Sequence, residues 1–106
     1  MGLFSKKKQT NPVVQTAEKL ILEQIKNDDD VYITGLATSM MEGSPLILNF
    51  DGLHIDRANK VISFITGVVF AIKGEILEIN ETTYLFGNSE VYKDGSIEEW
   101  LKSNIN

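Results

Sequence analysis

The spacing of apolar residues predicts the first helix of this 106-residue chain. In the stretch VYITGLATSMMEG, four apolar side chains recur three and four positions apart, which places them on one face of a helix. The preceding NDDD is a helix-start signal, and Gly43 and Pro45 end the segment. The residues on the expected buried face are Ile33, Leu36, Ala37 and Met40.

Two further segments predict a buried strand followed by a long helix. SPLILNF is a short apolar run between turn formers, which favours a strand over Leu46–Phe50. After Asp51-Gly52, the stretch DRANKVISFITGVVFAI is long enough for about four helical turns starting near Asp56. Its second half is apolar on nearly every side. Such a helix needs cover on two sides, either from a second subunit or from flanking parts of the same chain.

The remaining C-terminal part predicts a hairpin, a strand and a short helix. GEILEIN alternates in period two, Asn80-Glu81 turns the chain, and TTYLF is rich in β-forming residues. A further short strand is expected over Glu90–Lys93. Asp94-Gly95 then turns the chain, and Ser96 is expected to cap the helix IEEWLKSNI. The order predicts an α/β two-layer sandwich: one mixed sheet of about five strands, two main helices on it and a short C-terminal helix.

The segment EKLILEQIK, residues 18–26, fits two kinds of secondary structure. Helical spacing places four residues on one face: Leu20, Ile21, Gln24 and Ile25. Strand alternation instead places Leu20 and Leu22 opposite Ile21 and Ile25. Periodicity alone cannot decide for so short a run. Residues 1–17 are mostly polar and predict a flexible arm, followed by one core domain over residues 18–106.

The arm begins MGLFSKKK, which combines two bulky apolar residues with three consecutive lysines. Read alone, this stretch is either a frayed terminus or a contact with an anionic membrane, because lipid interfaces take up apolar side chains and attract lysine. The candidate membrane-contact residues are Leu3, Phe4, Lys6, Lys7 and Lys8.

Composition and charge argue against most chemical functions. The net charge of −5 argues against nucleic-acid binding, which needs a basic face, and the absence of cysteine removes thiolate chemistry. His54 is the only histidine, so it predicts a capping or surface role before the second helix and no metal centre. Ser44 and Ser63 have no histidine suitably placed for a hydrolase triad. We therefore expect neither an enzyme nor a cofactor.

Residues 43–92 resemble the core of SepF, a family of bacterial cell-division proteins that link FtsZ filaments to the membrane. No single motif carries the resemblance; the ordered series does. It covers residues 43–92 well and residues 19–42 loosely. The matching residues, in order, are Gly43-Ser44-Pro45, Asn49-Phe50, Phe64-Ile65-Thr66-Gly67, Phe70-Ala71-Ile72, Gly74, Ile79 and Tyr84.

The resemblance implies an α/β sandwich that forms homodimers and possibly a higher polymer, an N-terminal membrane-binding segment and a pocket for the C-terminal tail of FtsZ. It also assigns residues 18–26 to a strand. The implied location is cytoplasmic, peripheral at the inner face of the cell membrane at mid-cell. The residues expected to bind the tail are Glu78, Tyr84 and Phe86. Those expected to make self-association contacts are Val61, Phe64, Ile65, Gly67, Val68 and Val69.

Four positions, in three segments, depart from the family pattern. Ser63 replaces a common acidic residue, Gly87-Asn88 replaces the usual Thr-Pro, and Glu78 lies in a strand where some relatives carry a basic residue. These departures bear on tail binding more than on the fold. The alternative function is therefore a dimeric interaction module of the same fold that does not bind FtsZ.

Overall fold

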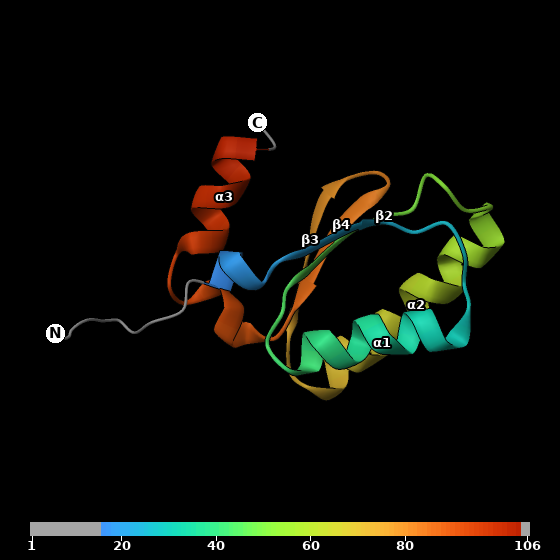
Figure 1. Ribbon diagram of the computed structural model, residues 1–106, viewed down its shortest axis with the longest axis horizontal. Coiled ribbons are helices and arrows are strands. Elements are labelled where there is room, and N and C mark those ends of the chain that lie inside the picture. Colours follow the sequence, from blue (N-terminus) through green and yellow to red (C-terminus); the bar gives the residue numbers. More distant parts are fainter. Residues whose placement is uncertain (1–15, 105–106) are drawn as a thin grey trace, which may run out of the picture.

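The computed structural model describes residues 16–104, and four strands of this part form one mixed sheet of order β1-β2-β4-β3 (Figure 1). β1 (Ile21–Gln24) runs parallel to β2 (Leu46–Asn49). β3 (Glu75–Asn80) and β4 (Thr83–Gly87) form an antiparallel hairpin, and β4 pairs antiparallel with β2. The α/β class is thus confirmed, and the sheet has four strands where about five were expected.

The helices divide between the two faces of the sheet. α1 (Asp30–Met41) and α2 (Ile55–Ala71) lie together on one face. α3 (Ser96–Asn104) lies on the other side, where it contacts the short 3₁₀ turns η1 (Thr16–Lys19) and η2 (Ser89–Tyr92). The boundary expected between arm and core, at residues 17 and 18, therefore falls inside η1. Residues 1–15 lie outside the described residues.

The first helix forms where the apolar spacing predicted it. The carboxylate of Asp29 accepts a hydrogen bond from the backbone N–H of Tyr32 at 3.2 Å and caps the helix. All four residues of the expected face are buried, so this prediction is confirmed. The strand assignment of residues 18–26 is confirmed as well, because β1 lies inside that segment.

α2 begins at Ile55, one residue before the expected start. The ring nitrogen Nδ1 of His54 accepts a hydrogen bond from the backbone N–H of Asp56 at 3.4 Å, so the capping role predicted for this histidine is confirmed. One side of the helix is buried, but the side chains of Phe64 and Phe70 remain 45% and 85% exposed. Within the described chain, only one side of the apolar helix is therefore covered.

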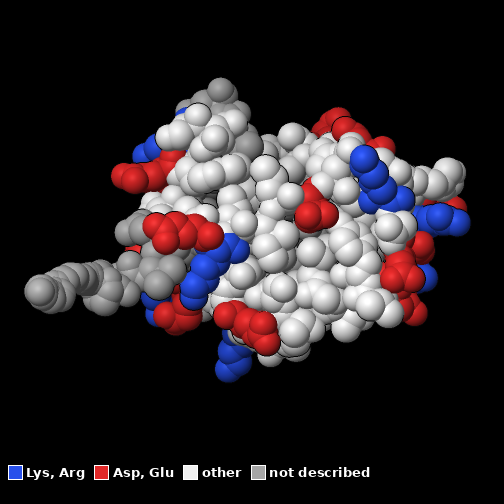
Figure 2. All heavy atoms as spheres, viewed as in Figure 1, with Lys and Arg blue, Asp and Glu red and all other residues white. Residues whose placement is uncertain are grey.

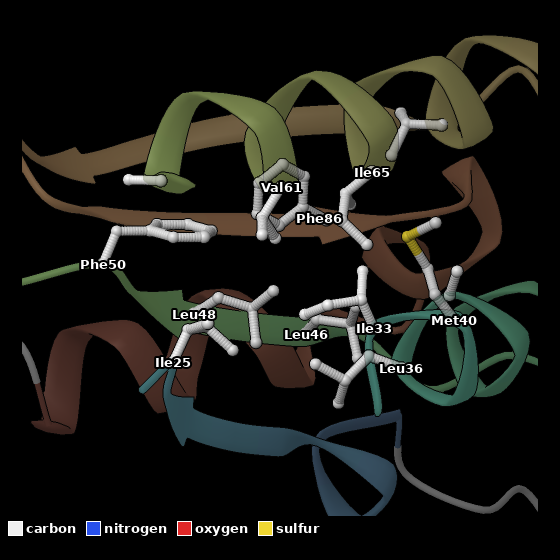
Figure 3. Packing of buried hydrophobic residues seen from close by; sticks show 13 residues of the cluster. Ile25, Ile33, Leu36, Met40, Leu46, Leu48, Phe50, Val61, Ile65 and Phe86 are labelled. Atoms are coloured by element: carbon white, nitrogen blue, oxygen red, sulfur yellow. The ribbon is translucent and has the colours of Figure 1, made fainter. Parts of the chain in front are cut away.

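The main hydrophobic core fills the space between the sheet and the two helices α1 and α2 (Figure 3). Side chains from β2, β4 and both helices point into it; Leu46, Leu48, Phe86, Val61 and Ile65 are among the labelled residues. A smaller core lies on the opposite face and consists of Ile47, Leu85 and Ile97, with Trp100 and Tyr92 packed against it. Both sheet faces thus hold apolar residues, but only the α1–α2 face carries a large core.

The strand predicted over Glu90–Lys93 is wrong. The chain forms the 3₁₀ turn η2 there, because the side chain of Asn88 accepts a hydrogen bond from the backbone N–H of Glu90 at 3.0 Å and starts a turn. Val91 is buried against the rest of the fold without pairing to a strand. A side-chain cap therefore determines the conformation of this segment, although the strand preference of its residues favoured a strand.

Ser96 does not cap α3 in the way predicted; it is the first residue of that helix. The carboxylate of Asp94 accepts hydrogen bonds from both the backbone N–H and the hydroxyl of Ser96, at 2.9 and 2.7 Å. The Ser96 hydroxyl oxygen in turn accepts a hydrogen bond from the backbone N–H of Ala17 at 3.0 Å. This serine therefore joins the start of α3 to η1.

We expect Gly74→Ala to lower the free energy of unfolding by about 2–3 kcal/mol. A Cβ atom at this position would collide with the backbone carbonyl oxygen of Gly87, so the start of β3 would have to shift. The matched control is Gly67→Ala, with both variants compared at a dilution where the chain is monomeric: nothing in the chain lies within 4 Å of a Cβ there, and alanine favours the helix by about 1 kcal/mol. Urea unfolding followed by circular dichroism should give opposite signs; equal effects would contradict the close contact at Gly74.

Candidate functional site

An open groove lies between α2 and the turn that joins β3 to β4. Its volume is about 220 Å³. We call it the α2–hairpin groove, and its lining residues are Phe50, Asp51, Leu53, Ile55, Ala58, Asn59, Ile62, Glu81, Thr82 and Tyr84. The groove therefore combines an apolar floor with several polar and acidic groups.

Strand pairing brings these separate segments together. The antiparallel register places Asn49, at the end of β2, opposite Thr83, at the start of β4. The amide of Asn49 donates a hydrogen bond to the Thr83 hydroxyl oxygen at 2.9 Å, and the backbone N–H of Phe50 donates to the carbonyl oxygen of Thr82 at 2.8 Å. The loop that leads into α2 is consequently held beside the hairpin turn.

Three aromatic rings lie beneath the groove. The ring centroids of Tyr84 and Phe50 are 6.1 Å apart, and Phe86 lies 6.1 Å from Tyr84 and 6.5 Å from Phe50. Such tilted and edge-on arrangements are the favoured geometries for aromatic contacts. Two of the three rings, Phe50 and Tyr84, line the groove, and Tyr84 is the more exposed of the two.

The structure brings two of the three predicted tail-binding residues together. Glu78 on the edge strand β3 is the cross-strand partner of Tyr84 on the interior strand β4, so both lie on the sheet face that carries α1 and α2. Phe86 is fully buried behind Tyr84 and Phe50 and could shape a bound peptide only through those two rings. Tail binding by any of the three stays a prediction.

The residues predicted for self-association divide into two groups. Val61, Ile65 and Val69 are buried in the chain's own core, and Val68 is half-buried. Phe64 and Gly67 are exposed. The three buried side chains already pack inside the chain's own core. Only Phe64, Gly67 and part of Val68 are therefore accessible to a second copy.

The outer surface of the two helices exposes further uncharged residues. We call this surface the helical face and define it as Val31, Thr34 and Gly35 on α1 with Phe64 and Gly67 on α2. Val31 is 81% exposed, and a small groove of about 120 Å³ runs between the helices beside Phe64. Figure 2 shows an uncharged stretch over α1, with acidic and basic groups around it.

Several residues of the α2–hairpin groove were not singled out from the sequence, notably Asp51, Ile55, Asn59 and Glu81. Two turns, Asp51-Gly52 and Asn80-Glu81, were recognised separately. Their closeness follows from the pairing of β2 with β4, which periodicity does not specify. Knowledge of that pairing would have placed both turns at the same end of the sheet.

Two tyrosines away from the groove have perturbed acidities. Burial, together with the hydrogen bond and charge of Glu23, raises the pKa of Tyr32 to about 12; its hydroxyl donates to that carboxylate at 2.8 Å. Burial and the charge of Glu75 raise the pKa of Tyr92 to about 12. Both phenols stay protonated at neutral pH, so they act as hydrogen-bond donors that join elements of the fold.

The described residues contain no cluster of three or more histidine or carboxylate side chains that could hold a metal ion. Among the helices of residues 16–104, none combines the length and the apolar character required to cross a membrane.

Comparison with known proteins identifies the family. The family model described as "Cell division protein SepF" matches residues 24–92. A cell division protein SepF from Lacticaseibacillus casei (strain BL23) is 29% identical over 93 residues, which cover 88% of this chain and 60% of the relative. The SepF of Carboxydothermus hydrogenoformans is 28% identical over 82 residues, which cover 77% of this chain and 58% of the relative. A third, from Lactiplantibacillus plantarum, is 38% identical over 50 residues, or 47% of this chain and 36% of the relative.

The chain thus spans about three fifths of the length of the first two curated relatives. The family model covers well over half of the chain, including the helix α2 and the hairpin that form the groove. The resemblance predicted from residues 43–92 is therefore confirmed, and the chain belongs to the SepF family of cell division proteins.

Proposed function

We propose that this chain self-associates, binds the C-terminal tail of FtsZ and links FtsZ filaments to the membrane at the division septum. Membership of the SepF family supports a role in cell division. The observation that carries the tail-binding part is the α2–hairpin groove. It contains Tyr84 and lies beside Glu78, the two accessible residues for which the resemblance implies tail binding.

The size and lining of the groove suit a peptide. Its volume of about 220 Å³ is below the roughly 300–1,000 Å³ of typical sites for small molecules and cofactors. A groove of this size takes a few anchoring side chains of an extended or helical segment. Apolar side chains would be anchored on Leu53, Ile55 and Ile62, with Tyr84 as an aromatic contact.

The helical face supports the self-association part of the proposal. Exposed aromatic and aliphatic side chains on neighbouring helices are typical of contact surfaces, and Phe64 and Val31 provide them here. Gly67 lies on the same surface and has no side chain, so a partner backbone could approach α2 closely. A second copy of the chain is the proposed occupant, and further contacts would extend a dimer into a polymer.

The membrane contact is proposed for the N-terminal arm. Its residues Leu3, Phe4 and Lys6, Lys7 and Lys8 lie outside the described residues, so the proposal depends on their chemistry alone. Two apolar side chains would enter the lipid interface and three lysines would lie over anionic headgroups. The protein would then be cytoplasmic and peripheral at the inner face of the cell membrane, at mid-cell.

A second candidate function is a dimeric module of the SepF fold that does not bind FtsZ. The observation that favours it is Glu78, because some relatives carry a basic residue in that strand and this chain carries a carboxylate. The two candidate functions differ in whether the chain binds the FtsZ tail. A direct test of tail binding therefore separates them.

We expect Tyr84→Ala to weaken binding of a fluorescent peptide with the sequence of the FtsZ C-terminal tail by at least tenfold, because it removes an aromatic contact from the groove. Fluorescence anisotropy on the full chain measures the effect. Tyr32→Ala is the matched control: this tyrosine is also half-buried but bonds to Glu23 on the far strand of the sheet.

The control variant should bind as tightly as the unchanged protein. If the unchanged protein does not bind the tail while dimers persist, the second candidate function is supported. If Tyr84→Ala and Tyr32→Ala bind equally well, the peptide lies elsewhere than in the groove.

A further inference from the structure

We infer that the α2–hairpin groove selects a cationic peptide, in which lysine or arginine residues lie next to the apolar side chains that enter the groove. The inference rests on the proposed function, since it takes the FtsZ tail as the occupant and specifies the sign of its charge. It goes further because it predicts which tails the groove accepts and which it rejects.

Acidic side chains border this groove, and basic ones are missing from its lining. Asp51 and Glu81 are among the lining residues, which include no lysine or arginine. Glu78 is exposed and lies across from Tyr84 in the strand pairing. The carboxylates therefore come from three places: the loop after β2, the edge strand β3 and the turn that follows β3.

These three carboxylates have no ion-pair partner within residues 16–104. The ion pairs there join Lys60 to Asp28 at 3.6 Å and Lys93 to Glu90 at 2.8 Å, and His54 lies 4.0 Å from Asp56. The side chains of Asp51, Glu78 and Glu81 take part in none of them. Their negative charge is thus left for solvent or for a ligand.

Ordinary structural roles explain only some of the acidic side chains near the groove. Asp56 lies in the first turn of α2, where a carboxylate interacts favourably with the helix dipole, and it does not line the groove. A charge such as Glu78 on an exposed edge strand also discourages pairing with other chains. That role does not extend to Asp51 and Glu81, which lie in turns beside an apolar depression.

The sign of the charge determines which peptides can use the apolar floor. A peptide with lysine or arginine near its anchors gains attraction to the rim, while one with carboxylates is repelled. This attraction or repulsion acts between exposed charges, so salt screens it. The Debye length is about 8 Å at physiological ionic strength. Selectivity should therefore be largest at low salt.

The test uses the full chain and three fluorescent peptides: the FtsZ tail, the same tail with all its charged residues changed to lysine, and the same tail with them changed to glutamate. At low salt the lysine version should bind at least tenfold more tightly than the glutamate version. Glu78→Lys combined with Glu81→Lys should reduce that ratio by about tenfold, from the loss of two exposed ion pairs and added repulsion.

The matched control is Glu98→Lys combined with Glu99→Lys. It makes the same change in net charge on α3, on the other side of the sheet, and both residues are exposed. This variant should keep the preference of the unchanged protein. Circular dichroism should show that both double variants fold.

The outcomes separate the inference from the proposed function. Equal binding of all three peptides, or tighter binding of the glutamate version, overturns the inference and leaves tail binding intact. Binding of the lysine version without binding of the native tail supports the charge preference but contradicts FtsZ as the partner. Absence of binding by every peptide overturns both.

Discussion

Gly67→Lys is expected to convert an assembled protein into folded monomers. Gly67 is exposed in the middle of α2, and nothing lies within 4 Å of a Cβ atom at that position, so lysine fits the single chain without a clash. Lysine also favours a helix over glycine by somewhat less than about 1 kcal/mol. The substitution should consequently leave the isolated chain at least as stable as before.

The same lysine would be unfavourable at a close helix contact. The neighbouring exposed rings of Phe64 and Phe70 leave the partner an apolar surface to cover. An uncompensated charge placed in such an interface costs several kcal/mol, which corresponds to a loss of association of at least a hundredfold. Light scattering coupled to size-exclusion chromatography should show a fall from the assembled mass to the monomer mass.

Ser103→Lys is the matched control for this result. It adds the same single charge at an exposed position of α3, on the opposite side of the sheet from the helical face. Its assembled mass should equal that of the unchanged protein. An unchanged mass for Gly67→Lys would show that α2 is not the contact surface.

The elements that the sequence predicted well are those with a strong local pattern. The first helix has an apolar stripe, an aspartate cap and a glycine that ends it, and these signals agree with its packing on the main core. The long helix was recognised by the same means. Its exposed rings, Phe64 and Phe70, also follow from its pattern, because the sheet can cover only one side of an all-apolar helix.

The less predictable elements are short and depend on distant partners. β1 has four residues and three of them are exposed, so it carries no clear alternation; the resemblance to a family supplied the strand assignment. At Glu90–Lys93 the side chain of Asn88 starts a 3₁₀ turn, and a local hydrogen bond outweighed residue preference. At β1 the deciding contact is the parallel pairing with β2, and at Glu90–Lys93 it is one side-chain hydrogen bond. A pattern of apolar residues encodes neither.

The candidate site could be predicted only in part for a similar reason. Tyr84 and Glu78 were found because they lie in a recognisable hairpin at family spacing. Asp51 and Ile55 belong to a different segment and reach the groove through the pairing of β2 with β4. A long-range strand pairing thus determines half of the site, while the sequence pattern of each segment determines only its local conformation.

Phe4→Ala is expected to reduce binding to anionic vesicles by about 30-fold in monomers and by a much larger factor in the assembled protein. Burying Leu3 and Phe4 at a lipid interface contributes roughly 1.5–3 kcal/mol each, and three lysines over anionic lipid add about 1 kcal/mol apiece. One arm therefore supplies at most about 6–9 kcal/mol before the cost of ordering it, which gives weak and reversible binding.

The proposed self-association would change that estimate, because the arms of one assembly would bind the membrane together. Once one arm is inserted, a second arm meets the membrane at a high effective concentration, so the contributions of the arms combine. Loss of about 2 kcal/mol per arm then reduces the binding constant of a monomer by about 30-fold, and that of a dimer by close to the square of this factor. Gly67→Lys should also weaken vesicle binding, although its position is far from the arm in sequence.

Vesicle sedimentation with anionic and neutral lipid measures these effects. Leu22→Ala is the matched control, since it removes another largely exposed apolar side chain, from β1 and outside the arm. The expected order of binding is the unchanged protein and Leu22→Ala first, then Gly67→Lys and Phe4→Ala, and last the variant that combines Gly67→Lys with Phe4→Ala. Equal sedimentation of a chain that lacks residues 1–10 would contradict a membrane contact by the arm. Equal sedimentation of Gly67→Lys monomers and the unchanged protein would show that one arm is sufficient, and that the link between assembly and membrane binding is absent.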